Sequence, residues 1–397
     1  MAYTIEHLPK ERWQGYILPM RYTSDSYYDV RVDRTADGFA ASFRKTPARP
    51  PIEHTPEEYD FPDRLYAEYY EGAFAWGIVQ DKELLAAIET CPETWSNRLR
   101  VTELWVAEEL RGQGIGRALL NLAKEQAGRE RRRAVILETQ SCNANAIGFY
   151  LHEGLTLTGF DACCYRNDDL DRKEVRLELG WFRNKPERLS PDKITVREER
   201  PEEWFETEAI TRRAFWNRYR PGCDEHFLVH KLRSSPAYRP ELSRVAVVEG
   251  RIVGCILYSE SQIRDGAAVH PVLTFGPLCV DPAWQGRGIG ERLLGETLPL
   301  AAGAGYPGVV IYGEPDYYPR LGFRPCGRFG ITTPEGETSD AFMAIELVPG
   351  GLADVHGTFY EAAVFHDLPP EAAAAYDRRF PPLEKQRFPG QWAEKKS

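Results

Sequence analysis

The stretch RGQGIGRALL, Arg111 to Leu120, places three glycines within five residues, directly before a pair of leucines. Glycine adopts positive φ angles and lets the backbone approach a ligand closely, and the free N–H groups at the start of a helix attract phosphate. A very similar stretch, QGRGIGERLL, runs from Gln285 to Leu294. The sequence therefore predicts two glycine-rich turns, each at the start of a helix that can bind an anion.

The two turns belong to a longer repeat with a constant spacing of 174 residues, the separation of Gly114 and Gly288. Apolar runs match at the same spacing: Leu104–Val106 with Leu278–Val280 upstream, and Val135–Leu137 with Val309–Ile311 downstream. This spacing is far longer than the unit of a solenoid, so it indicates two copies of a whole domain.

Each copy reads as a β-rich run, the glycine turn, a helix with leucines at helical spacing, and a second β-rich run. This order is a βαβ unit, which predicts a mixed or parallel α/β sheet. We expect a first domain at 1–185, a charged and proline-containing linker at 186–192, and a second domain at 193–349. The extension at 350–397 mixes proline, alanine and charge, and we expect it to pack on the surface.

Composition restricts the partners and the location of the protein. The chain of 397 residues is too long for one ordinary core, and its formal charge of −10 argues against nucleic acid or anionic lipid and favours a cationic partner. Neither a secretory signal nor a run of about 18 apolar residues is visible, so we expect no membrane segment. The eight cysteines are scattered, as is typical of reduced thiols, which favours a cytoplasmic location. Cys223, His226 and His230 lack a further ligand pair, so we expect no metal.

Two common nucleotide motifs fail on residue identity. A P-loop requires Gly-Lys-Ser/Thr after its four-residue gap, and neither copy has that lysine. A dinucleotide fingerprint requires a third glycine where Arg117 stands in the first copy and Glu291 in the second.

The pattern Arg/Gln-x-x-Gly-x-Gly after a strand resembles the acetyl-CoA signature of the GNAT N-acetyltransferases. It stands here as Arg111 to Gly116 and as Gln285 to Gly290. The resemblance covers nearly the whole chain apart from the C-terminal extension. It implies two tandem GNAT domains of the α/β (α+β) class, each a mixed, mostly antiparallel sheet flanked by helices.

The resemblance also implies acetyl-CoA as the cofactor, with its pyrophosphate on the backbone N–H groups of the turns and its pantetheine along the preceding strands. In the first copy it points to Leu104, Trp105, Val106, Arg111, Gly112, Gln113, Gly114, Gly116, Arg117 and Asn143. In the second copy it points to Leu278, Cys279, Val280, Gln285, Gly286, Arg287, Gly288, Gly290 and Glu291.

Acetyl transfer to an amine requires a base, because an alkyl amine with a pKa of about 10.4 is protonated at neutral pH. Glu103 is an unusual residue inside the apolar run VTELWV, since burial of a carboxylate is costly. It resembles the GNAT base, although an outward-facing glutamate at the sheet edge is the alternative. Glu138 in ILETQ is the competing base. Tyr150 closes NANAIGFY, which matches the family's Asn-x-x-Ala-x-x-x-Tyr helix, so the resemblance implies a general acid there; a core aromatic is the alternative.

The second copy departs from this pattern. Pro277 stands at the position of Glu103, and the stretch from the central glycine to the tyrosine is 30 residues long against 36 in the first copy. Tyr318 keeps the position of the acid, and Glu314 or Asp316 could replace the base. The shortened form resembles a recognised GNAT subgroup, so the shortening alone does not indicate loss of activity.

The segment Ile52 to Gly72 is rich in acids and tyrosines, which suits an ammonium-bearing substrate. The alternative is a solvated acidic loop, above all at Glu57, Glu58 and Asp60. The first domain also resembles streptothricin acetyltransferases in YTSDSYYDV, ILETQ, NANAIGFY and GFDACCY, and these enzymes acetylate the β-lysine amine of a cationic antibiotic.

We therefore expect an acetyl-CoA-dependent N-acetyltransferase that acts on a primary amine of a small cationic substrate, with antibiotic resistance as one role. Direct attack in a ternary complex is expected, because the strands offer no motif for a covalent acyl-enzyme. The alternatives are an acyl-CoA sensor with one or both domains non-catalytic, and a protein-lysine acetyltransferase. The sequence indicates no oligomeric state.

Overall fold

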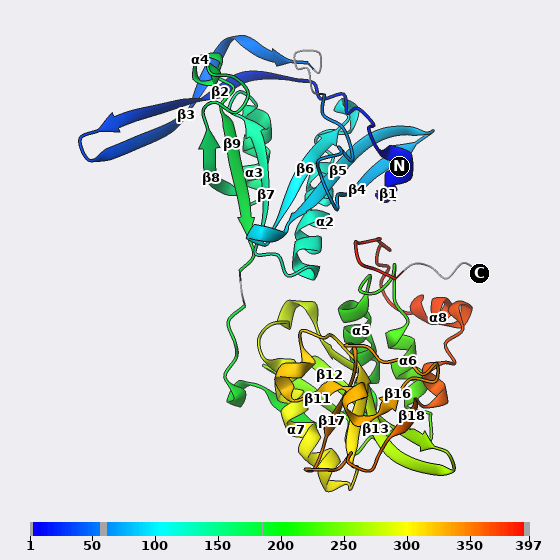
Figure 1. The fold of residues 1–397 in the computed structure, drawn as a ribbon. Helices are drawn as coiled ribbons and strands as arrows, with labels where there is room; N and C mark the ends of the chain where they lie inside the picture. Colours follow the sequence, from blue (N-terminus) through cyan, green and yellow to red (C-terminus); the bar gives the residue numbers. More distant parts are fainter. Residues whose placement is uncertain (1–2, 56–61, 185, 393–397) are drawn as a thin grey trace. The chain divides into compact units, whose positions relative to one another are not determined.

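The computed structural model describes residues 3–55, 62–184 and 186–392, which form two compact units (Figure 1). The first unit contains the described residues up to Asn184 together with Gln386–Gly390. The second contains the remaining described residues, so the segment predicted as a linker, 186–192, belongs to the second unit. No helix in the described part of the chain has the length and apolarity of a membrane span.

The first unit combines strands and helices in the order that the βαβ pattern predicts around the glycine turn. Its elements are β1 (Glu6–Leu8), α1 (Lys10–Trp13), β2 (Tyr22–Thr35), β3 (Gly38–His54), β4 (Phe74–Gln80), β5 (Glu83–Glu93), β6 (Arg98–Val106), α2 (Ile115–Arg129), β7 (Ala134–Gln140), α3 (Ala144–His152), β8 (Thr156–Asp161), α4 (Asp169–Arg172) and β9 (Arg176–Phe182).

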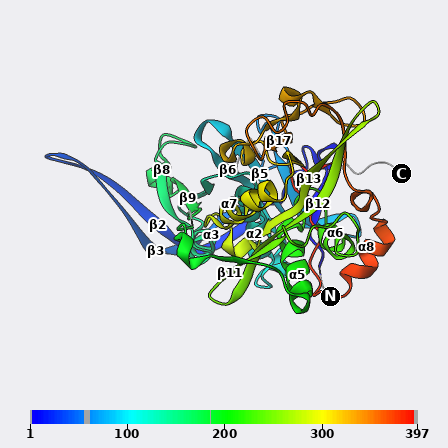
Figure 2. The ribbon, with the colours of Figure 1, turned by 90° about the horizontal axis from the view of Figure 1, so that it is seen from below.

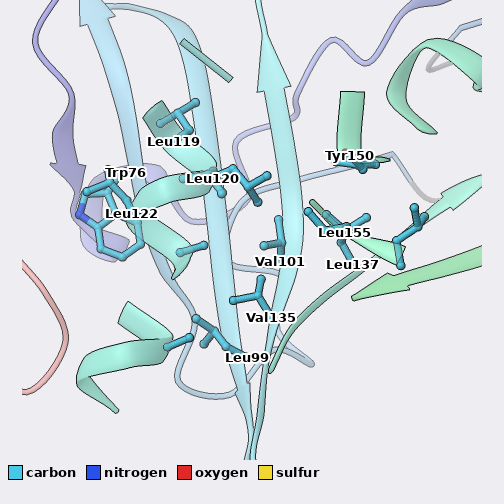
Figure 3. Close-up of a cluster of buried hydrophobic side chains, with 14 of the residues drawn as sticks. Trp76, Leu99, Val101, Leu119, Leu120, Leu122, Val135, Leu137, Tyr150 and Leu155 are labelled. Carbon is cyan, nitrogen blue, oxygen red and sulfur yellow. The ribbon is translucent and has the colours of Figure 1, made fainter. Parts of the chain in front are cut away.

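The main sheet of this unit has the strand order β1-β4-β5-β6-β7-β9-β8. Among its described strands only β6 and β7 pair in parallel, and the other neighbours are antiparallel. Apolar residues at helical spacing turn one face of α2 towards the sheet, and this face is buried. Figure 3 shows Leu119, Leu120 and Leu122 of α2 gathered with Trp76 beside β6, which carries Leu99 and Val101.

The strands β2 and β3 form a separate hairpin that projects from the rest of the unit (Figures 1 and 2). In the middle of β2 Val30 is buried, and the ring of its cross-strand partner Phe43 lies 5.2 Å from that of Phe160, whereas Phe39 near the tip is 81% exposed. The Tyr28 N–H donates to the Ser141 carbonyl (2.8 Å). These contacts hold the middle of β2 beside β8 and the end of β7.

The second unit repeats the same plan. Its elements are β10 (Thr195–Arg197), α5 (Trp204–Phe215), α6 (Glu225–Leu232), β11 (Arg244–Val248), β12 (Arg251–Asp265), β13 (Ala268–Val280), α7 (Ile289–Gly303), β14 (Gly308–Tyr312), β15 (Arg324–Pro325), β16 (Ile331–Thr332), β17 (Phe342–Glu346), β18 (Gly357–Tyr360) and α8 (Pro370–Asp377). The sheet order is β10-β11-β12-β13-β14-β17-β15, and β18 pairs with β12 and β16.

The repeat holds at the level of individual backbone pairs. Leu99 pairs with Val135 in the parallel ladder of the first unit, and Leu273 pairs with Val309 in that of the second. Both pairs are related by the 174-residue spacing. Each buried position of α7 lies 174 residues after a buried position of α2. Each unit is therefore a mixed, mostly antiparallel sheet flanked by helices, as predicted.

The C-terminal extension is more deeply incorporated than the predicted packing on the surface. The strand β18 joins the second sheet and buries Phe359. Phe388 is 3% exposed and belongs to the core of the first unit, where its ring lies 5.5 Å from that of Trp76. The guanidinium of Arg129 lies 4.2 Å from the same ring. The apolar residues of this segment are widely spaced, so no periodic pattern in the sequence announces their burial.

We predict that Phe388→Ala lowers the free energy of unfolding of the first unit by about 3 kcal/mol, because it removes a buried aromatic ring. Urea-unfolding curves of the full chain provide the measurement. Leu383→Ala is the control, since Leu383 is 40% exposed and its truncation should change stability by less than about 0.5 kcal/mol. Equal effects of the two substitutions would contradict the burial of Phe388.

Candidate active site

The first glycine turn lies open at the start of α2. Gly112 and Gly114 have φ angles of 75° and 81°, a region that L side chains avoid. A methyl group built on either glycine would have no neighbouring heavy atom within 4 Å. The side chain of Arg111 anchors the turn, because its Nε donates to the Val106 carbonyl (3.1 Å) and its Nη2 to the Arg21 carbonyl (3.2 Å). The first N–H groups of α2 thus stand at an accessible backbone surface.

The strands β6 and β7 diverge on the side of this turn (Figure 1). Their pairing ends at Arg100 and Ile136, although β6 continues to Val106 and β7 to Gln140. The backbone of β6 beyond Arg100 is thereby left without a ladder partner on that side. A cavity of about 530 Å³ lies between the end of β6, the turn and α3.

The cavity brings together most residues predicted to bind a cofactor in the first copy. They are Leu104, Trp105, Val106, Arg111, Gly112, Gly114, Gly116, Arg117 and Asn143. Gln113 is not part of the lining, and its Nε2 donates to the Glu109 carbonyl (2.9 Å). Met20 and Arg21 also line the cavity, which sequence reasoning missed because they reach it only through the fold.

Helix α3 supplies two of the predicted residues. Asn143 caps this helix, and its side chain accepts a hydrogen bond from the Ala146 N–H (3.1 Å). Tyr150 lies two residues before the end of α3, lines the cavity and is 8% exposed. Burial raises the pKa of the Tyr150 hydroxyl above its ordinary value, and the nearby Glu103 carboxylate raises it further. Tyr150 therefore keeps its proton at neutral pH.

Glu103 lies buried on β6, with 9% of its surface exposed. Burial raises the pKa of its carboxyl well above the ordinary value, and the charges of Asp63 and Glu89 raise it further. A hydrogen bond from the Arg64 backbone only partly counteracts this shift. Glu103 is thus a carboxyl that holds its proton more tightly than a solvated glutamate does.

Glu138, the competing base, lies in a different electrostatic environment. Its carboxylate pairs with Arg100 (3.0 Å) and with Arg176 (2.6 Å). Within residues 3–55, 62–184 and 186–392, no arginine or lysine forms an ion pair with Glu103. The carboxylate of Glu138 is thus held in two ion pairs with arginines.

Aromatic residues lie near these carboxyl groups. The rings of Tyr69 and Tyr70 meet edge to face with centroids 4.7 Å apart, and Tyr69 is 73% exposed. Burial raises the pKa of Tyr70, and the charges of Glu138 and Glu103 contribute to that shift. Glu57, Glu58 and Asp60, which the sequence also suggested for an ammonium group, lie outside the described residues.

The second glycine turn has the same backbone as the first. Gly286 and Gly288 have φ angles of 78° and 90°, and Gln285 Nε2 donates to the Val280 carbonyl (3.1 Å), as the first turn's arginine does to its own strand. On β13, Leu278 and Val280 pack against the core of the second unit. Cys279 is buried, with its Sγ 3.3 Å from the Sγ of Cys255.

The surroundings of the second turn differ from those of the first. The carboxylate of Glu291 pairs with the guanidinium groups of Arg188 and Arg320. The side chain of Arg287 lies over the ring of Trp284, with its guanidinium carbon 5.0 Å from the centroid. Gly290 faces the hydroxyl of Tyr317.

The predicted catalytic positions of the second unit also lie in a different setting. Tyr318 begins a short 3-10 turn, Tyr318–Leu321, and burial raises the pKa of its hydroxyl. Glu314 forms an ion pair with Arg218 (2.7 Å). Pro277 occupies the β13 position that corresponds to Glu103 and has no ionisable side chain. Among the described residues, no buried carboxyl that lacks an ion pair, as Glu103 does in the first unit, lies beside Tyr318.

Known proteins resemble both halves of the chain. The Acetyltransferase (GNAT) family matches residues 40–154, and the Acetyltransferase (GNAT) domain matches residues 241–325. Streptothricin acetyltransferase of Streptomyces lavendulae is 30% identical over 148 residues, which cover 36% of this chain and 76% of that protein.

Two proteins of Escherichia coli are also similar. The uncharacterised N-acetyltransferase YjhQ of strain K12 is 37% identical over 100 residues, 25% of this chain and 55% of YjhQ, so this match spans just over half of that relative. The crystal structure of the GNAT family N-acetyltransferase YhbS in complex with CoA is 25% identical, with a TM-score of 0.40, and the match covers 47% of this chain and 97% of YhbS.

We predict that Glu103→Gln makes stability less dependent on pH. The folded protein binds the Glu103 proton more tightly than the unfolded chain does. The protonated carboxyl therefore makes its full contribution to the free energy of unfolding below the ordinary pKa of 4.5. The contribution is lost as the pH rises towards the raised pKa, with a slope of up to about 1.4 kcal/mol per pH unit. Glutamine has no proton to lose, so the variant should gain stability over the wild type as the pH increases.

Urea unfolding of both proteins between about pH 5 and about pH 8 measures this difference. Glu138→Gln is the control, because it removes a carboxylate that is paired with arginines and should not produce the same change of slope. If the free energies of unfolding of Glu103→Gln and the wild type change in parallel with pH, the pKa of the buried carboxyl is not raised.

Proposed function

The chain belongs to the Acetyltransferase (GNAT) family, and on that premise we propose that it transfers the acetyl group of acetyl-CoA to a primary amine of a small cationic substrate. The observation that carries the proposal is the open glycine turn of the first unit. It opens on a cavity that Tyr150 lines, and the buried carboxyl of Glu103 lies on the adjoining strand.

The backbone of the first unit has features that suit the binding of coenzyme A. Gly112 and Gly114 leave open space above the start of α2, where unpaired N–H groups and the positive end of the helix dipole favour a pyrophosphate. The unpaired edge of β6 at Leu104–Val106 can hydrogen-bond an extended pantetheine. A cavity of about 530 Å³ has the size of a small-molecule site.

Bound acetyl-CoA supplies an acetyl thioester, and the residues of the chain handle the protons. Glu103 accepts a proton from the substrate ammonium, directly or through a water, because its raised pKa suits a base that works near neutral pH. Tyr150 remains protonated and holds a proton for the sulfur that leaves. The N–H groups of β6 can polarise the carbonyl under attack. We propose direct attack by the amine in a ternary complex.

Charge and aromatic surface support a cationic acceptor. The charges of Asp63 and Glu89 act on Glu103, and Tyr69 exposes a ring nearby. Carboxylates and aromatic faces both attract ammonium groups. The similar protein from Streptomyces lavendulae is a streptothricin acetyltransferase, so we propose a streptothricin-like amine as the first acceptor to test.

The second unit supports a different role. Pro277 offers no base, and the carboxylate of Glu314 is held by Arg218. We therefore propose that catalysis depends on the first unit, and that Tyr318 is not required for it.

We predict that Tyr150→Phe lowers kcat by at least about 100-fold, because the leaving sulfur loses its proton donor. Thiol release from acetyl-CoA, with streptothricin and other cationic amines as acceptors, provides the measurement. The matched control is Tyr318→Phe, which removes the equivalent hydroxyl of the second unit and should leave kcat within about twofold of the wild type.

Loss of turnover in Tyr318→Phe but not in Tyr150→Phe would indicate that the second unit is the catalytic one. Tight binding of acetyl-CoA without thiol release for any amine would favour the acyl-CoA sensor or a protein lysine as the acceptor.

A further inference from the structure

We propose that the segment Pro186–Leu189 covers the glycine turn of the second unit, so that coenzyme A can bind there only when this segment is displaced. The segment and the turn belong to the same unit. The two glycine turns have the same backbone conformation and are related by the 174-residue repeat. They differ because the second turn is covered and the first is open.

Backbone and ring contacts place the segment directly on the turn. The Leu189 N–H donates to the Arg287 carbonyl (3.0 Å), in the middle of the turn. A methyl group built on Gly286 would lie 2.6 Å from Cγ of Pro186, whereas the equivalent Gly112 has open space. The pyrrolidine ring therefore fills the volume that a phosphate needs above the second turn.

Arg188 fills the next position along the turn. A methyl group on Gly288 would lie 3.2 Å from Arg188 Nη2, and the equivalent Gly114 again has open space. The guanidinium pairs with Glu291, with Nη1 3.3 Å from Oε1. A cationic side chain of the protein thus lies across the glycine whose open counterpart faces the cavity of the first unit.

The charge at the helix start supports the same conclusion independently. Glu291 lies in the first turn of α7, where it places a carboxylate at the positive end of the helix dipole. Arg320 also pairs with it (3.1 Å). The corresponding residue of the first unit is Arg117. Glu291 thus takes the place of an external anion at the start of α7 while Arg188 and Arg320 pair with it.

The attachment of the cover is weak enough for displacement. The side chain of Arg188 is 64% exposed, and exposed ion pairs contribute little to stability. The backbone beneath it keeps the positive φ angles that an anion-binding turn requires. Because only the uncovered state can bind, the apparent affinity of the second turn is reduced by the fraction of molecules that are uncovered.

The test counts acetyl-CoA sites by isothermal titration calorimetry on the full chain. We expect one site in the wild type, and a second site, at least about tenfold tighter than any second site of the wild type, in Pro186→Gly/Arg188→Ala. The matched control is Glu187→Ala/Lys193→Ala, which changes one residue of the cover and one residue shortly after it and should bind like the wild type. Among the described residues, neither side chain forms a hydrogen bond or an ion pair with the turn.

The readout is binding, so it is independent of the proposed catalysis. Two equally tight sites in the wild type would overturn the cover, as would an unchanged number and affinity of sites in Pro186→Gly/Arg188→Ala. If the wild type releases no thiol with any amine while Pro186→Gly/Arg188→Ala gains a second site, the proposed function is overturned and the cover remains supported.

Discussion

The first N–H groups of a helix have no partner within that helix, and the candidate site depends on where those of α2 point. Gly112 and Gly114 take positive φ angles, and within the described part of the chain no neighbouring heavy atom lies within 4 Å of a methyl group built on either. Arg111 ties the turn to the end of β6 through the Val106 carbonyl. The same stretch of backbone therefore joins the anion-binding end of the helix to the strand edge along which an acyl chain can lie.

The divergence of β6 from β7 has a cost that the fold offsets elsewhere. Beyond Arg100 the backbone of β6 pairs with β5 but no longer with β7, and Glu103 is buried on the same strand. Stability comes from the opposite face, where α2, Trp76 and Phe388 form a closely packed core. The unfavourable burial of polar groups near the end of β6 is thus offset by the burial of apolar side chains in the core of the same unit.

Local patterns in the sequence predicted much of the fold. The spacing of 174 residues reappears in the backbone pairs Leu99–Val135 and Leu273–Val309, because equal spacing of strands and helices gives equal register. A carboxylate inside an apolar run singled out Glu103, with an outward-facing glutamate as the alternative, and the structure buries it. Both depend on residues that are close in sequence.

The features that escaped prediction depend on long-range contacts. Phe388 reaches the first core from the far end of the chain, and Met20 and Arg21 line the cavity without any motif of their own. The segment Pro186–Leu189 has the composition of a linker but lies on the second turn. Such contacts arise from the path of the chain in space, which periodicity and local composition do not encode.

The most direct measurement is hydrogen–deuterium exchange of the backbone amides with and without acetyl-CoA. If the first turn is the coenzyme site, added acetyl-CoA should slow the exchange of residues 112–117 and leave residues 286–291 unchanged at the same concentration. Protection confined to residues 286–291, or no protection at either turn, would contradict the account.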